Sequence, residues 1–131
     1  MKLRYVRKVR WTILAVCDER GGCQLLDFLG DSACPTGKAA RNMLALIART
    51  AEHGLSGNRE LSRDLGDDIY ELRKSGLRVL FFYDAGRVII CSHAYPKQSQ
   101  KIGHGQKERA CRARKLYFEA KHNGELEILD S

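Results

Sequence analysis

The stretch DIYELRKSGLRVLFFYDAGRVIICSH, residues 68–93, decides the fold. It holds three runs rich in β-branched and aromatic residues: Asp68–Lys74, Leu77–Tyr83 and Arg87–His93. Ser75-Gly76 separates the first two runs, and three residues separate the last two. Connections this short join antiparallel neighbours. The sequence therefore predicts a three-stranded antiparallel meander, and the apolar residues on both faces of its later runs predict a central, covered position.

Segments outside the meander also have regular patterns. Val9–Cys17 places apolar residues on one side at period two, which predicts a strand. Thr36–His53 has apolar residues at helical spacing and stops before Gly54, so we expect a helix there. Gln106–Lys121 is expected to be a second, strongly basic helix. We interpret residues 55–67 and 94–105 as loops, and the order of residues 1–8 and of the acidic tail 125–131 stays open.

Length and charge limit the classes of function. With 131 residues, we expect a single domain over residues 1–131. The net charge of +7 favours a polyanionic partner such as nucleic acid, although a basic, solvated surface would have the same composition. No apolar run reaches the roughly 20 residues of a membrane span, so we expect no membrane partner.

The N-terminal residues and the cysteines bear on the compartment. Residues 1–17 mimic a signal peptide, but the apolar run is short and Asp18-Glu19-Arg20 stops it, so a first strand explains it better. The chain has five cysteines, an odd number without close pairing. This usage suits a reducing compartment, and the spacings match no zinc motif. We therefore expect a cytoplasmic protein with no metal.

Several spaced elements of the C-terminal half resemble one family. Ile69–Arg73, Leu77–Asp84 and Gly86–Ile90 occur in order, followed by Lys97-x-x-Gln100-Lys101 and a basic helix that begins at Lys107-Glu108-Arg109-Ala110. These elements and their order resemble the phage-derived, HigB-like branch of the RelE/ParE toxin superfamily. The resemblance implies an α+β class and a small RelE-like fold. It implies a twisted antiparallel sheet of about four strands with helices packed on one face.

The resemblance also implies an activity and partners. Members of this branch are toxins of type II toxin–antitoxin pairs, mostly ribosome-dependent endoribonucleases that cut mRNA. We therefore expect metal-free attack by the 2′-hydroxyl without a cofactor. The expected partners are a helix-turn-helix antitoxin, the ribosome and mRNA. The alternative is a non-catalytic binding module on the same fold, either a ParE-like inhibitor of DNA gyrase or a phage-derived binder of another host target. The segment around Pro96 and Lys97 departs from the family, which usually has two adjacent lysines there.

Metal-free RNA cleavage defines the candidate catalytic residues. It needs a proton acceptor for the 2′-hydroxyl, cations at the phosphate and a proton donor for the leaving oxygen. Arg73 and Arg78 are expected to hold the phosphate, with ion pairing to Glu71, Asp67 or Asp68 as the alternative. The remaining catalytic candidates are His93 or Lys97 as the proton acceptor, and Tyr95, which could stack on a base or assist proton transfer. His93 could equally be a strand-end histidine, and Tyr95 an aromatic at the rim of the core.

Further basic residues are candidates for RNA binding. Lys101 and His104 lie in the segment before the second helix, and His104 stands between two glycines. A self-solvating basic loop is the alternative for Lys101 and for Lys97. Lys107, Arg109 and Arg112 belong to the helix itself, where they are expected to contact ribosomal RNA. A solvated helix face is compatible with the same residues.

Overall fold

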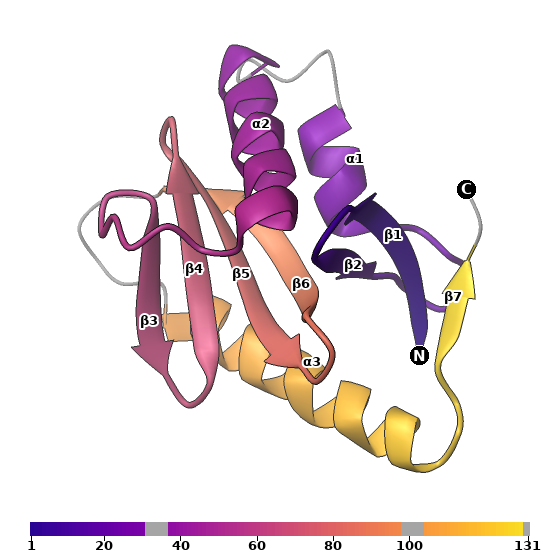
Figure 1. Ribbon diagram of the computed structural model, residues 1–131. Helices are drawn as coiled ribbons and strands as arrows, with labels where there is room; N and C mark the ends of the chain where they lie inside the picture. The colour runs from indigo at the N-terminus through magenta and orange to yellow at the C-terminus, as the bar shows by residue number, and fades with distance from the viewer. Residues whose placement is uncertain (31–36, 98–103, 130–131) are drawn as a thin grey trace.

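The described residues form one sheet and three helices. The computed structural model describes residues 1–30, 37–97 and 104–129, without the side chain of His104. In chain order the elements are β1 (Lys2–Lys8), β2 (Thr12–Val16), α1 (Gln24–Gly30), α2 (Gly37–His53), β3 (Ser62–Gly66), β4 (Ile69–Lys74), β5 (Leu77–Asp84), β6 (Val88–Pro96), α3 (His104–His122) and β7 (Glu127–Leu129). The strand order in the sheet is β3-β4-β5-β6-β2-β1-β7 (Figure 1).

The predicted meander is present as β4, β5 and β6. Both strand pairs are antiparallel. The connection between β4 and β5 has positive φ at Ser75 (52°) and Gly76 (77°). Two consecutive positive φ values make a type I′ turn, whose twist matches that of the strands it joins. The turn is also tied to α2, because Asn42 Nδ2 donates a hydrogen bond to Ser75 Oγ at 2.9 Å.

The expected sheet of about four antiparallel strands is wrong, because the sheet is seven-stranded and mixed. β2 pairs in parallel with β6, and β1 pairs antiparallel with β2 and in parallel with β7. β1 and β3 carry many charged residues, and β7 has three residues. Such strands lack a local hydrophobic signal, and parallel pairs join segments that lie far apart in the sequence. The sequence pattern therefore does not indicate these three strands.

The strand expected over Val9–Cys17 is shorter than predicted, because residues 9–11 form the connection between β1 and β2. β1 ends at Lys8 and β2 begins at Thr12. Between them, the backbone N–H groups of Arg10 and Trp11 donate hydrogen bonds to the Ala51 carbonyl, at 3.1 and 2.8 Å. That carbonyl lies in the last turn of α2, where carbonyls have no partner within the helix. The end of α2 thus fixes the position of the β1–β2 turn.

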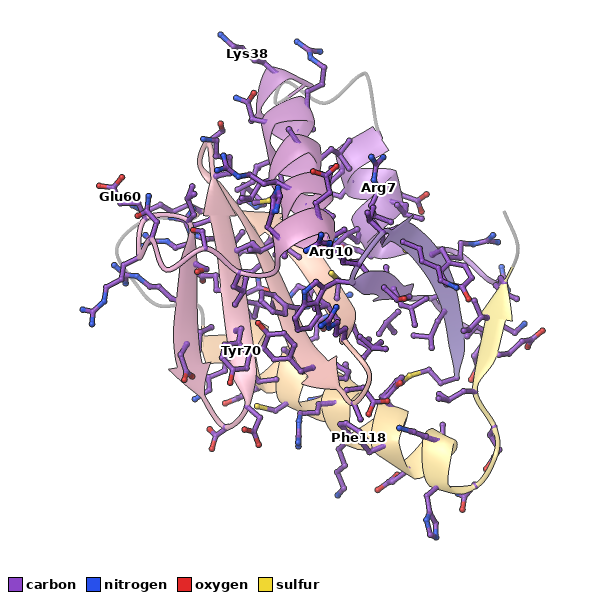
Figure 2. All side chains as sticks on the ribbon, in the orientation of Figure 1. Arg7, Arg10, Lys38, Glu60, Tyr70 and Phe118 are labelled. Atoms are coloured by element: carbon purple, nitrogen blue, oxygen red, sulfur yellow. The ribbon has the colours of Figure 1, made fainter. Side chains whose placement is uncertain are left out.

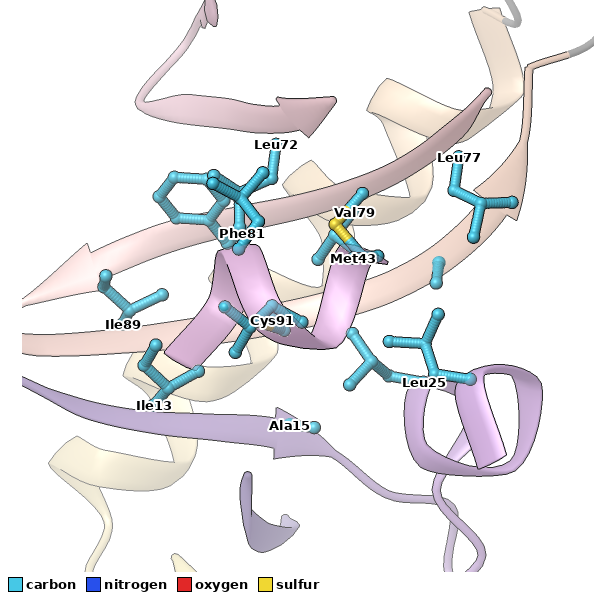
Figure 3. Packing of buried hydrophobic residues seen from close by; sticks show 14 of the residues in the cluster. Ile13, Ala15, Leu25, Met43, Leu72, Leu77, Val79, Phe81, Ile89 and Cys91 are labelled. Carbon is cyan, nitrogen blue, oxygen red and sulfur yellow. The ribbon is translucent and has the colours of Figure 1, made fainter. Parts of the chain in front are cut away.

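Helices cover both faces of the sheet, so the expectation of helices on one face is also wrong. On one face, α1 and α2 contribute Leu25, Met43 and Ile47 to a buried apolar cluster with the strands (Figure 3). On the other face, α3 contributes Ala110 and Tyr117 to a second cluster. The reason lies in β5, whose side chains from Leu77 to Phe82 are all buried. A strand with apolar residues on both sides requires cover on both sides.

α3 is held against the sheet by three ion pairs spaced seven residues apart. Lys107 Nζ lies 2.9 Å from an Asp67 oxygen, and Arg114 Nη2 lies 3.4 Å from Asp68. Lys121 Nζ lies 2.8 Å from Asp84, whose carboxylate also accepts a 2.6 Å hydrogen bond from the Tyr117 hydroxyl. Seven residues are two helical turns, so one edge of α3 faces these three acids. Among the described residues, no helix has the length and apolar character to span a membrane.

Candidate active site

Arg73, Arg78 and Tyr95 lie in one row across three neighbouring strands. Arg73 of β4 pairs with Arg78 of β5, and Arg78 pairs with Tyr95 of β6. Side chains alternate between the faces of a strand, and Arg73 and Arg78 share the parity of Ile69 and Leu80, which belong to the cluster under α3. The type I′ turn sets this register, and the register brings the two arginines together.

Glu71 is the centre of the cluster. Its Oε1 lies 3.3 Å from Arg73 Nε and 3.8 Å from Arg78 Nε. Its Oε2 accepts a hydrogen bond from the Tyr95 hydroxyl at 3.5 Å. The side chains of Glu71 and Arg78 are only 12% and 10% exposed, so a charge on either needs a partner. The ion pairing that the sequence left as an alternative is therefore present, and one carboxylate holds both arginines.

The cluster carries excess positive charge. Burial lowers the pKa of the Arg78 guanidinium, and the neighbouring charge of Arg73 lowers it further, while Glu71 opposes the shift. Arg63 of β3 acts in the same direction as Arg73, and it pairs in register with Glu71. Two guanidinium groups share one carboxylate and the charge of Arg63 adds to theirs, which leaves an unbalanced positive charge that an anionic ligand would neutralise.

Tyr95 is held as a neutral phenol. Burial raises its pKa to about 12, and the Glu71 carboxylate adds to this effect. The Tyr95 ring stacks on the His93 imidazole at a centroid distance of 5.6 Å. A protonated phenol beside a carboxylate and two arginines is equipped to donate a proton to a developing alkoxide.

His93 lies inside the molecule. It is 1% exposed, and both ring nitrogens have partners: Ser92 Oγ at 2.8 Å from Nδ1 and Gln106 Oε1 at 2.6 Å from Nε2. Burial lowers its pKa. A neutral ring with Nε2–H donating to Gln106 and Nδ1 accepting from Ser92 satisfies both contacts. His93 therefore joins β6 to the first turns of α3 and supports the Tyr95 ring.

The two arginines line a surface pocket of about 360 Å³ at the β4–β5 turn. Lys74, Ser75 and Gly76 form the turn side of this pocket. On the opposite side lies the segment that precedes β3, where Glu60 projects outward (Figure 2). The pocket is large enough for a phosphate group.

Lys97 lies next to this pocket. Its backbone N–H donates a 2.7 Å hydrogen bond to the Gly76 carbonyl, which continues the β5–β6 pairing past Pro96. Lys97 is exposed and follows Tyr95 by two residues, so strand alternation places it on the same side. Of the five expected catalytic residues, the structure brings four to the pocket or its border, with His93 beneath them.

The expected RNA-binding residues are spread over different surroundings. Lys101 and the side chain of His104 lie outside the described residues. Lys107 is paired with Asp67 at the sheet edge, and Arg109 lines a separate pocket between α1, β2 and α3. Arg112 is exposed. The basic helix thus presents its cations to several surfaces, and one of them belongs to the packing of the helix on the sheet.

Two residues of the site, Arg63 and Gln106, are not indicated by the sequence. A third, Glu71, is indicated only as an alternative ion-pair partner, and its alternation with Arg73 is the signal for it. Arg63 lies in a strand that the pattern did not indicate, and Gln106 reaches His93 only because α3 folds back over β6. In the part of the chain that the structure describes, no group of three or more His, Cys, Asp or Glu side chains could hold a metal ion.

The comparisons with known proteins agree with the phage-derived character expected from the sequence. The model of the family described as "Phage derived protein Gp49-like (DUF891)" matches residues 33–115. These residues include α2, the strands β3 to β6 and more than half of α3. A comparison with curated proteins finds no match. Since the matched segment covers most of the chain and the whole pocket, the chain belongs to the Gp49-like family of phage-derived proteins.

Proposed function

We propose that this protein is the toxin of a type II toxin–antitoxin pair and cleaves ribosome-bound mRNA in the cytoplasm. The observation that carries the proposal is the row of Arg73, Arg78 and Tyr95 around Glu71 at one pocket. Membership of a phage-derived family and the resemblance to the HigB-like toxins support it further.

In the proposed reaction, Arg73 and Arg78 bind the non-bridging oxygens of the scissile phosphate. Their charge stabilises the extra negative charge that develops when the 2′-oxygen attacks phosphorus. Glu71 holds the two guanidinium groups in place before substrate arrives, so less ordering is needed during the reaction. A phosphate takes over part of the arginine contacts that Glu71 makes in the free protein.

Proton transfer is assigned to the two side chains at the border of the pocket. Tyr95, a phenol whose pKa is raised to about 12, gives its proton to the leaving 5′-oxygen. Of the two expected proton acceptors, Lys97 is exposed, whereas both His93 nitrogens are engaged. We therefore assign Lys97 to the 2′-hydroxyl and give His93 a positioning role beneath Tyr95.

Attachment to ribosomal RNA needs exposed cations away from the pocket. Arg112 and Lys115 on α3 are exposed. Arg7 and Arg10 are exposed at the β1–β2 turn, near the end of α2 (Figure 2). Such contacts would make binding sensitive to salt, because each neutralised phosphate releases counterions.

The test is a translation reaction with one defined mRNA, read by primer extension. The wild-type protein is compared with Arg73→Ala and with Arg49→Ala, which removes an exposed arginine from α2. We expect ribosome-dependent cuts with the wild type and Arg49→Ala, and none with a folded Arg73→Ala protein. Intact mRNA with the wild type would contradict the nuclease proposal. Inhibition of gyrase supercoiling by the same sample would then favour the binding-module alternative.

A further inference from the structure

Two surface pockets adjoin along one flank of α3. The first has a volume of about 620 Å³ and the second about 580 Å³, and Cys17 and Asp18 line both. One wall is α3, and the other is formed by the segment between β2 and α1 with the start of the chain. We call the combined surface the α3 groove. Its helical wall is the side of α3 opposite to Lys107, Arg114 and Lys121, which pair with the sheet.

The residues of the helical wall follow one face of α3 over its length. They are Arg109, Ala113, Leu116, Ala120 and Asn123, at spacings of four, three, four and three residues, with Asn123 just past the helix end. At 1.5 Å per residue this face is about 21 Å long. Leu116 lies at its middle and is 49% exposed. The two alanines beside it leave room for the backbone of a partner to approach.

The charge of the groove is opposite to that of the molecule. Five carboxylates line it: Asp18, Glu19, Asp27, Glu119 and Glu125. Three cations lie among its described lining residues: Lys2, Arg109 and the α-amino group of Met1, which donates a hydrogen bond to the Glu125 carbonyl at 2.7 Å. The carboxylates therefore outnumber the cations in a chain whose net charge is +7. Asp18 is fixed in place, because its Oδ1 accepts hydrogen bonds from the backbone N–H groups of Arg20 and Gly22. A nucleic acid would be repelled here, and a cationic ligand attracted.

We propose that the α3 groove binds an amphipathic α-helix of a partner protein. The apolar side chains of that helix would pack on Leu116, and its lysines or arginines would face the carboxylates along the groove. A helix suits the groove better than an extended peptide, because the backbone groups of the α3 wall are already bonded within their own helix. An extended segment would find no strand edge on that wall, whereas a helix bonds its own backbone.

The groove is separate from the pocket at the β4–β5 turn, so this proposal does not depend on the nuclease activity. None of its lining residues is Glu71, Arg73, Arg78, Tyr95 or Lys97. Two lining residues of the first pocket reach the buried His93: Ser92, which hydrogen-bonds it, and Arg109, whose charge acts on its ring. A partner in the groove would therefore touch the support of the site and leave its arginines uncovered.

The experiment is a selection of binders from a displayed library of random peptides of about 16 residues, enough to span the groove as a helix. The full chain is the bait, and soluble Leu116→Glu protein is present as competitor. We expect enrichment of peptides with net positive charge and with apolar residues at spacings of three and four. In fluorescence anisotropy, Leu116→Glu should weaken the best peptide at least about tenfold, and Glu119→Lys should weaken it by a smaller factor.

Matched variants on other surfaces control for general effects. Leu44→Glu changes the exposed leucine of α2, and Glu108→Lys changes an exposed acid of α3 that does not line the groove. Both should leave peptide affinity unchanged. Equal binding by the wild type and a folded Leu116→Glu protein would overturn the proposal. So would enrichment of acidic or uncharged peptides, or no enrichment above an unrelated bait.

Discussion

The two faces of β5 differ in a way that separates stability from function. Leu77, Val79 and Phe81 point to the α2 face and are buried in the larger apolar cluster. On the α3 face, Leu80 and Phe82 are equally buried, but the first residue is Arg78. One strand therefore carries a face without charged residues and a face whose apolar middle lies between Arg78 at one end and Asp84, which pairs with Lys121 of α3, at the other.

The change from apolar residues to Arg78 occurs where the part of α3 that lies over this face changes. Ala110 and Tyr117 of α3 lie over the apolar part, whereas Gln106, in the first turn of α3, contacts His93 beside the charged part. Beyond the start of α3, Arg78 on this face lines the surface pocket at the β4–β5 turn. A polar cluster at the end of a covered sheet face can be bonded internally and still meet a ligand.

Phe81→Ala gives the largest effect on stability and tests the apolar face. Phe81 is fully buried, with ring contacts to Tyr70 at 5.7 Å and Tyr83 at 5.6 Å. Its truncation should lower the free energy of unfolding by about 3–5 kcal/mol, as for other buried aromatics. Urea denaturation measures the change. The half-buried Phe118 of α3 is the matched control, and an equal loss for Phe118→Ala would show that the two faces do not differ in this respect.

Arg78→Gln tests the charged end of the opposite face. The substitution removes a positive charge from the pocket at the β4–β5 turn and keeps hydrogen-bonding groups. The mRNA cleavage rate should fall about 10²–10³-fold, the effect of removing one group that stabilises a developing oxyanion. Cleavage is quantified by primer extension on samples whose circular dichroism matches the wild type. Undiminished cleavage by such a sample would remove Arg78 from the site.

His93→Gln tests the buried histidine beside the charged end of this face through the pH dependence of the unfolding free energy. Because burial lowers the pKa of His93 in the folded protein, the unfolded chain takes up this proton first, near its ordinary pKa of about 6.5. The stability that neutral His93 contributes is therefore lost progressively as the pH falls below about 6.5. Unfolding free energies at pH 7.5, 6.5 and 5.5 should decline less steeply for His93→Gln. We also expect a loss of about 1–2 kcal/mol at pH 7.5, because glutamine replaces the two hydrogen bonds imperfectly. Parallel pH profiles would contradict the buried neutral state.

Asp84→Asn gives the smallest expected effect and tests how α3 is held. Burial by itself would raise the pKa of Asp84, but hydrogen bonds from Lys121, Tyr117 and the Ala85 N–H outweigh it and lower the pKa. Its contribution is thus present above the unfolded pKa of about 3.9 and is lost as the pH falls through the lower folded pKa. The substitution should cost about 1 kcal/mol at pH 7, because Lys121 is half-exposed. Wild type and variant should converge below pH 4 in urea titrations, and a constant difference down to pH 2.5 would argue against this ion pair.

The part of the fold that could be predicted is the part with local signals. Fewer than about 20 consecutive residues are enough to indicate each of three features: the β4–β5 turn, the apolar runs of β5 and β6, and the helical spacing of apolar residues in α2. The α+β class follows from them. β3 and β7 could not be predicted in the same way, because a polar edge strand owes its place to the strand it pairs with and has no apolar face of its own.

The candidate site also contains residues with local sequence signals and residues placed only by distant contacts. Arg73 and Arg78 were identifiable because a two-residue turn pairs the residues on either side of it in a known register. The contacts of His93 with Ser92 and Gln106 were not, because they depend on where α3 lies on the sheet. That placement turns a residue expected to be a proton acceptor into one whose two nitrogens are already bonded.

By itself, the sequence determined the meander, the hairpin that pairs the two arginines, the long helix after residue 36 and the positive net charge. Each of these depends on neighbours in the chain, whose geometry the backbone limits to a few choices. The tertiary structure alone decided the parallel pairing of β2 with β6, the cover on both sheet faces, the buried state of His93 and the acidic α3 groove. These features depend on contacts between segments that lie far apart in the sequence. Such contacts form because the native packing buries more apolar surface and satisfies more hydrogen bonds than any competing packing of the whole chain.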